Sequence, residues 1–156
     1  MSNASAPRPG HQNPSILITG GAGFIGVNSA RYFAEQGWDI AILDNLSRRG
    51  TEDNLNWLRE QIDLRFERAD IRDPAAVDRI LADHQPDLVL HLAAQAAVTT
   101  SVTDPREDFE INALGTFNLL EAVRRFSPDS FIITASTNKG VRQDGREGRG
   151  RAQRPL

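Results

Sequence analysis

Three glycines near the amino end of the chain have the spacing that a dinucleotide pyrophosphate requires. They stand in the run TGGAGFIG, directly after the apolar residues Ile16–Ile18, and are Gly20, Gly23 and Gly26. The first permits a tight turn, the second lets backbone N–H groups approach phosphates, and the third lets a helix pack closely. That helix opens at Phe24 and Ile25, where its dipole and free N–H groups favour an anion. A glycine-rich turn without ligand is the alternative, and the strand-turn-helix context favours phosphate binding.

An acidic residue follows at the distance expected for a ribose contact. Asp44 ends the second apolar run, 18 residues after Gly26. A carboxylate there accepts hydrogen bonds from ribose hydroxyls and repels a 2′-phosphate, which predicts NAD in preference to NADP. Two arginines follow closely and can accommodate such a phosphate, and a simple turn role for Asp44 also stays open. The other candidate contacts in this loop are Asn45, Ser47 and Arg48.

A second carboxylate follows the third apolar run. Asp70 and Ile71 stand at its end, where a carboxylate can meet the amino group of an adenine. The alternative is that Asp70 caps the helix that follows. Asp73-Pro74 is a cap followed by proline at the first helical position.

These candidates need a scaffold, and the chain alternates apolar strands with amphipathic helices. Strands are predicted at Ile16–Ile18, Asp39–Leu43, Ile62–Phe66, Asp87–His91 and Ser130–Thr134. Helices are predicted at 24–36, at 52–60, from Pro74 onward, and from Pro105 to Phe126. This alternation predicts an α/β, doubly wound parallel sheet of the Rossmann type, in the strand order 3-2-1-4-5. Such a sheet binds its ligand at the carboxyl edge, where the strand order reverses.

Side-chain burial can also be predicted for parts of this scaffold. The long helix presents five apolar residues that are expected to face inward, namely Phe109, Leu114, Phe117, Leu120 and Val123. His91 at the end of the fourth strand is interpreted as a buried histidine rather than a catalyst. Tyr32 lies inside the first helix and is expected to serve packing.

Several motifs together resemble a known family. TGGAGFIG, DNLSR, ADIRD and HLAAQAAV agree in order and spacing with the extended short-chain dehydrogenase/reductases, the NAD-dependent epimerase/dehydratase group that acts on nucleotide sugars. The resemblance runs from Ile16 to Lys139 and implies NAD as cofactor. It also implies a cofactor-lining loop, an asparagine on the long helix, and a threonine that hydrogen-bonds the reacting hydroxyl. These residues are Leu92, Ala93, Ala94 and Gln95 in the loop, then Asn112 and Thr137.

The segments DNLSRRGTEDNLNWL and ASTNK are similar to the branch of this family that epimerises CDP-sugars at C2. The resemblance implies that NAD takes a hydride from the sugar and returns it to the other face, while a tyrosine of a Y-x-x-x-K helix moves the proton. The chain holds one tyrosine and one lysine, Tyr32 and Lys139, and no such motif. We therefore expect the chain alone to be inactive. A 4-epimerase, a dehydratase, and a non-catalytic dinucleotide-binding module are the alternatives.

Composition changes abruptly at both ends of the chain. Residues 1–14 are polar and predicted to be a disordered tail. Residues 140–156 contain five arginines, four glycines and two acids. A single-nucleotide insertion after the Lys139 codon is the hypothesis for this tail, because dropping one nucleotide permits V-Y-G, the family's continuation. The alternatives are a short protein with a basic tail and a product that does not fold stably. Residues 15–139 are then an incomplete NAD-binding Rossmann domain.

The overall composition excludes several classes of function. A net charge of −3 argues against a nucleic-acid binder, and the absence of cysteine excludes disulfide scaffolds and zinc–cysteine sites. No apolar run reaches the roughly 20 residues of a membrane helix, and the start has no signal-peptide core. We expect a cytoplasmic protein whose full-length relative binds a nucleotide sugar, a CDP-sugar in particular, and can form a homo-oligomer.

Overall fold

Five parallel strands form one sheet in the computed structural model, which describes residues 13–97 and 102–136. The strand order is β3-β2-β1-β4-β5, as the sequence predicts. The strands are β1 (Ser15–Thr19), β2 (Asp39–Asp44), β3 (Arg65–Arg68), β4 (Leu88–His91) and β5 (Phe131–Thr134). The predicted tail at 140–156 and most of the one at 1–14 lie outside the described residues.

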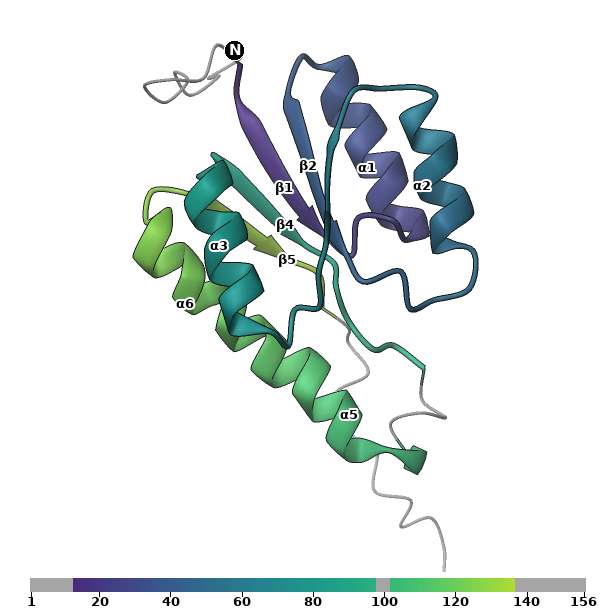
Figure 1. The fold of residues 1–156 in the computed structure, drawn as a ribbon, viewed down its shortest axis with the longest axis vertical. Coiled ribbons are helices and arrows are strands. Elements are labelled where there is room, and N and C mark those ends of the chain that lie inside the picture. The colour runs from purple at the N-terminus through teal and green to yellow at the C-terminus, as the bar shows by residue number, and fades with distance from the viewer. Residues whose placement is uncertain (1–12, 98–101, 137–156) are drawn as a thin grey trace, which may run out of the picture.

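Helices cover both faces of this sheet (Figure 1). One layer holds α1 (Phe24–Glu35) and α2 (Thr51–Arg59), and the other holds α3 (Pro74–His84) and α6 (Thr116–Phe126). Before α6 the chain passes through α5 (Pro105–Phe109) and a π-helical stretch, η1 (Glu110–Gly115). None of the helices within the described ranges has the length and apolarity needed to cross a bilayer.

The central strand β1 shows why the sheet is buried on both faces. All five of its residues are buried. Leu17 packs in the core beneath α3 and α6, whereas Ile16 and Ile18 pack in the core beneath α1. Successive side chains of a strand point to opposite faces, so a continuous apolar run is what a strand between two helical layers requires.

The third strand begins later than the alternation of apolar residues predicts. The predicted start at Ile62 is wrong, because the strand starts at Arg65. The backbone N–H of Ile62 donates to the carbonyl of Leu58, so this residue still completes the last turn of α2. Ile62 and Leu64 nevertheless pack, partly buried, against the core beneath α1. Their apolar side chains suit this partly buried position, and a residue can be buried there without belonging to a strand.

The long helix is divided by η1, and its predicted inward face is wrong for four of five residues. Only Val123 is buried; the exposed residues are Phe109 (63%), Leu114 (41%), Phe117 (59%) and Leu120 (44%). Residues three apart turn by about 300°, so a stripe built on that spacing drifts around the helix. The buried set is Leu119, Ala122 and Val123, which has the i, i+3, i+4 spacing of one helical face.

Adjacent leucines in α6 provide a test of this face. Leu119 is fully buried and Leu120 is 44% exposed. We expect Leu119→Ala to lower the free energy of unfolding by about 2–5 kcal/mol, because it leaves a cavity between α6 and the sheet. The matched variant Leu120→Ala should cost less than about 1 kcal/mol. Urea unfolding followed by circular dichroism measures both, and equal costs would contradict the assigned face.

Candidate functional site

A cavity of about 320 Å³ opens at the carboxyl edge of the sheet, where the strand order reverses between β1 and β4. Most of the residues selected from the sequence line it. They are Gly20, Gly23, Asp44, Asn45, Ser47, Arg48, Asp70, Ile71, Leu92, Ala93, Ala94 and Gln95. The fold therefore brings four separate segments of the chain to one groove, which we call the cofactor groove.

The glycine turn between β1 and α1 forms one wall of this groove. Gly20 has a φ of +67°, and a Cβ there would lie 2.7 Å from the backbone nitrogen of Ala93. A Cβ on Gly26 would lie 2.5 Å from the Cα of Gly21, so the first turn of α1 touches the chain that enters it. Gly23 carries no side chain over the N-terminus of α1 and faces the groove. These are the three requirements that the spacing predicts.

The start of α1 is left without a side-chain cap. Its N-cap is Gly23, which makes no side-chain hydrogen bond, and the first turn contains no acidic residue. Phe24 and Ile25, also predicted to contact the cofactor, are 80% and 62% exposed and do not line the cavity. An uncapped helix N-terminus at a concave surface can receive an anionic group.

Asp44 ties the glycine turn to the end of β2. One carboxylate oxygen accepts from the backbone N–H of Ala22 at 3.0 Å, and the other accepts from that of Leu46 at 2.8 Å. The second contact makes Asp44 a turn residue as well as a wall of the groove. The side chain is buried, so these two bonds fix where the carboxylate points.

Asp70 is held in place as an anion at the far side of the groove. Arg72 donates to its two carboxylate oxygens at 2.9 and 2.8 Å, and Asn45 donates to one of them at 3.0 Å. The hydrogen bonds from Arg72 hold the pKa of the Asp70 carboxyl well below its usual range. The helix that follows is capped by Asp73, which accepts from two backbone N–H groups of its first turn. The interpretation of Asp70 as the helix cap is therefore wrong.

Arg48 reaches across the groove from the loop after β2. Its guanidinium donates to the carbonyl of Ala94 at 3.3 Å and to the side chain of Gln95 at 3.2 Å. Ser47, beside it, donates its backbone N–H to the side chain of Asn45 at 3.0 Å. The loops after β2 and β4 are thus joined over the cavity.

Asn112 lies in η1 and holds the loop after β4 rather than lining the cavity. Its side-chain oxygen accepts from the backbone N–H of Gln95 at 2.8 Å, and its amide donates to the carbonyl of Gln95 at 2.9 Å. This pair of bonds satisfies both backbone groups of Gln95. The π-helical stretch therefore holds the loop after β4 through Asn112, and such stretches are frequent at functional sites.

Sequence reasoning missed several residues that lie at or beside the groove. The cavity is also lined by Leu43, Thr51, Ala69, Glu107 and Ile111. His91 is buried, as predicted, and burial lowers its pKa. Its ring contacts hydroxyls of Thr19 and Thr116, a link between β1, β4 and α6 that no local pattern indicates. Thr137, the predicted contact of the reacting hydroxyl, lies outside the described residues.

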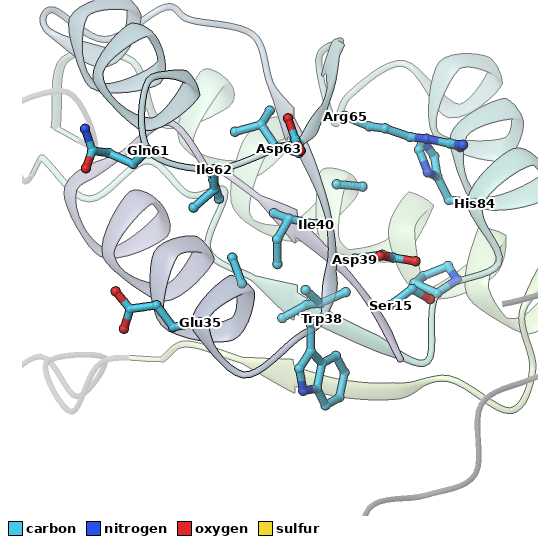
Figure 2. Close-up of a pocket in the computed structure, with 15 residues that line it drawn as sticks. Ser15, Glu35, Trp38, Asp39, Ile40, Gln61, Ile62, Asp63, Arg65 and His84 are labelled. Atoms are coloured by element: carbon cyan, nitrogen blue, oxygen red, sulfur yellow. The ribbon is translucent and has the colours of Figure 1, made fainter. Parts of the chain in front are cut away.

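A larger cavity, of about 710 Å³, lies at the opposite end of the sheet (Figure 2). Trp38, Ile40 and Ile62 contribute apolar surface to it, and Asp39 and His84 also line it. Its lining includes neither a glycine turn nor a helix N-terminus, because the amino ends of parallel strands meet the carboxyl ends of the helices. The smaller cavity is the one that has the glycine turn and the helix N-terminus typical of a phosphate site.

Comparison with known proteins identifies the family to which the chain belongs. The GDP-mannose 4,6 dehydratase family model matches residues 17–139, which is most of the chain. The chain belongs to this family of nucleotide-sugar epimerases and dehydratases. Among curated proteins, CDP-paratose 2-epimerase from Salmonella typhi is 49% identical over 124 residues, and dTDP-glucose 4,6-dehydratase from Escherichia coli strain K12 is 43% identical over 112. These two matches cover 80% and 71% of this chain, respectively.

Solved structures of the family share the fold. UDP-glucose 4-epimerase from Thermus thermophilus, in complex with NAD, is 42% identical with a TM-score of 0.63, over 72% of this chain and 34% of that one. The UDP-Glc/GlcNAc 4-epimerase from Campylobacter jejuni is 30% identical with a TM-score of 0.75, over 81% of this chain and 38% of that one. The chain spans 37% of the Salmonella typhi epimerase and 31% of the Escherichia coli dehydratase.

The pair formed by Asp70 and Arg72 predicts a pH-dependent part of the stability. Because the pKa of Asp70 is lower in the folded chain than in the unfolded one, its contribution is full above about pH 4 and is lost as the pH falls. We expect Asp70→Asn to lower the free energy of unfolding by about 1 kcal/mol at pH 7, with a smaller difference at pH 3. Urea unfolding at both pH values measures this.

Glu121→Gln is the matched control, since Glu121 pairs with Arg124 at 2.9 Å on the exposed side of α6. An exposed pair contributes little, so this variant should unfold like the original chain at both pH values. A difference between Asp70→Asn and the original chain that does not change with pH would contradict the assigned ionisation.

Proposed function

We propose that this chain is the NAD-binding portion of a nucleotide-sugar epimerase, most similar to CDP-paratose 2-epimerase. The observation that carries the proposal is the cofactor groove itself. It joins a glycine turn, an uncapped helix N-terminus and the fixed Asp44 carboxylate at the reversal point of the sheet. The 49% identity to the Salmonella typhi enzyme supports the finer assignment.

The residues present fit a dinucleotide. The turn at Gly20 and Gly23 and the N-terminus of α1 would hold the pyrophosphate, and Asp44 would accept hydrogen bonds from the adenosine ribose. Asp70, fixed by Arg72, would accept from the adenine amino group. When bound, NAD supplies a hydride acceptor, and the residues of the chain bind and orient it. The NAD complex of the Thermus thermophilus relative supports this choice of cofactor.

Two observations favour NAD over NADP. The Asp44 carboxylate is fixed at the end of β2 by two backbone N–H groups, where a 2′-phosphate would meet a negative charge. Arg48, the cation that could compensate that charge, is already bonded to Ala94 and Gln95 across the groove.

The sugar that the full-length relative binds is proposed from resemblance alone. CDP-paratose is favoured by the higher identity to that epimerase. The dTDP-glucose 4,6-dehydratases and UDP-glucose 4-epimerases among the relatives keep those reactions as alternatives, and a non-catalytic dinucleotide-binding module is a further one. Homo-oligomer formation and a cytoplasmic location stay predictions.

Inactivity of the 156-residue chain is also part of the proposal. Its single tyrosine, Tyr32, lies in α1 and is 60% exposed, where it does not line the groove. No residue of the chain can then serve as the phenolate base that the resemblance implies.

Titration calorimetry tests the cofactor assignment. We expect the chain to bind NAD and to bind NADP more weakly. Asp44→Asn should weaken NAD binding by about tenfold, because a charge-assisted hydrogen bond to the ribose becomes a neutral one, and should narrow the preference over NADP. Asp39→Asn, at the opposite end of the same strand, is the control and should leave both affinities unchanged.

Failure of the unaltered chain to bind NAD would refute the proposed function. Incubating the NAD-loaded chain with CDP-paratose and analysing the sugar by NMR tests inactivity separately. We expect no epimerised product, and turnover would show that the missing tyrosine is not required.

A further inference from the structure

Hydrogen bonds join three elements beneath the cofactor groove through the ring of His91. Thr19 ends β1, and His91 stands opposite it at the end of β4 in the parallel register. The hydroxyl oxygen of Thr19 lies 2.6 Å from Nδ1 of His91, and Nε2 lies 2.9 Å from the hydroxyl oxygen of Thr116. Both ring nitrogens thus have a hydroxyl partner, in a place where His91 is only 3% exposed.

Thr116 fixes the direction of these bonds. Its hydroxyl donates to the backbone carbonyl of Asn112 at 2.7 Å. A hydroxyl has one proton to give, so towards His91 the oxygen of Thr116 acts as an acceptor, and Nε2 must carry a proton. Burial lowers the pKa of His91 and favours the neutral ring. A neutral ring has one N–H, so Nδ1 is bare and accepts from the hydroxyl of Thr19.

This series of hydrogen bonds reaches both walls of the cofactor groove, one at each of its ends. Thr19 directly precedes Gly20, the first residue of the glycine turn, and its hydroxyl oxygen also accepts from the backbone N–H of Ala93 at 3.3 Å. At the other end, Asn112 holds both backbone groups of Gln95 in the loop after β4. The glycine turn and this loop are the two sides between which a dinucleotide would lie.

Thr116 also bonds to the π-helical stretch that contains Asn112. The backbone N–H of Thr116 bonds to the carbonyl of Ala113, one residue short of the α-helical partner. Its hydroxyl occupies the carbonyl of Asn112 instead. The carbonyl of Asn112 is the one that the backbone N–H of Thr116 would bond in a regular α-helix, and the Thr116 hydroxyl donates to it only if its proton points away from His91.

We propose that His91, as the neutral tautomer protonated at Nε2, is a positioning residue that fixes the glycine turn and the loop after β4 at the spacing a dinucleotide needs. His91 touches no ligand itself and acts through Thr19 and Thr116. The inference rests on the proposed NAD binding and deepens it. It also predicts that Thr116 affects the affinity for NAD, although Thr116 does not line the cavity.

Nitrogen NMR of the full chain tests the tautomer directly. With ¹⁵N-labelled histidine, we expect His91 to show a proton on Nε2 and none on Nδ1 at pH 7. The other histidines are His11 and His84, and His84→Gln helps to assign the signals. A proton on Nδ1 with a bare Nε2, or a doubly protonated ring, would overturn the proposal.

Two substitutions at Thr116 separate positioning from stability. Thr116→Val removes the hydroxyl at nearly constant volume, and we expect it to weaken NAD binding about three- to tenfold, as the loss of a buried hydrogen-bond partner implies. Thr116→Ser keeps the hydroxyl and should bind NAD within about twofold of the original chain. Calorimetric titration and thermal unfolding are measured on each variant.

His84→Gln is the matched control for a general loss of stability. His84 is buried like His91, but it bonds to Glu67 at 3.2 Å and lies by the cavity at the opposite end of the sheet. We expect it to lower the melting temperature without changing the affinity for NAD. If Thr116→Val behaves in the same way, positioning is refuted while the proposed function stands. If the original chain does not bind NAD, both fail.

Discussion

The close approach of backbone to backbone at the glycine turn is the constraint on which the rest of the groove depends. A Cβ on Gly26 would lie 2.5 Å from the Cα of Gly21, and a Cβ on Gly20 would lie 2.7 Å from the nitrogen of Ala93. Only glycines allow α1 to start this near to β1 while the loop after β4 stays in contact. With larger residues at these positions, the helix N-terminus and the loop after β4 would move apart, and the two walls of the cofactor groove would no longer lie close together.

Hydrogen bonds then give this close-packed turn a defined position. Asp44 holds it from the side of β2 through Ala22, and Thr19 connects it to β4 through His91. Each of these side chains stands at the carboxyl end of a strand, and the parallel register sets those ends beside one another. The sheet therefore does more than support the turn, because it brings the fixing groups within hydrogen-bonding distance from two directions.

Sequence predicted those parts of the structure that depend on local spacing. The glycine triad and most of the residues at the groove follow from patterns of a few residues, and the strand order follows from the alternation of strands and helices. The resemblance of HLAAQAAV to a family located the loop after β4. The start of β3 and the inward face of α6 were not predictable in this way. Ile62 is apolar because it packs beneath α1, not because it lies in a strand. Phe117 and Leu120 are apolar although they are exposed. Hydrophobicity alone therefore predicted the wrong strand start and the wrong helix face.

The π-helical stretch shows why the remaining part of the site could not be read from the sequence. Nothing in EINALG indicates a π-helix, and Thr116, directly after it, bonds to the carbonyl of Asn112 and accepts from His91. His91 and Thr116 are 25 residues apart in the sequence, so no window of helical length contains both. The stretch matters because it turns Asn112 towards Gln95. A residue outside the groove thereby determines the shape of its wall, and the fold of the whole sheet is needed before that role exists.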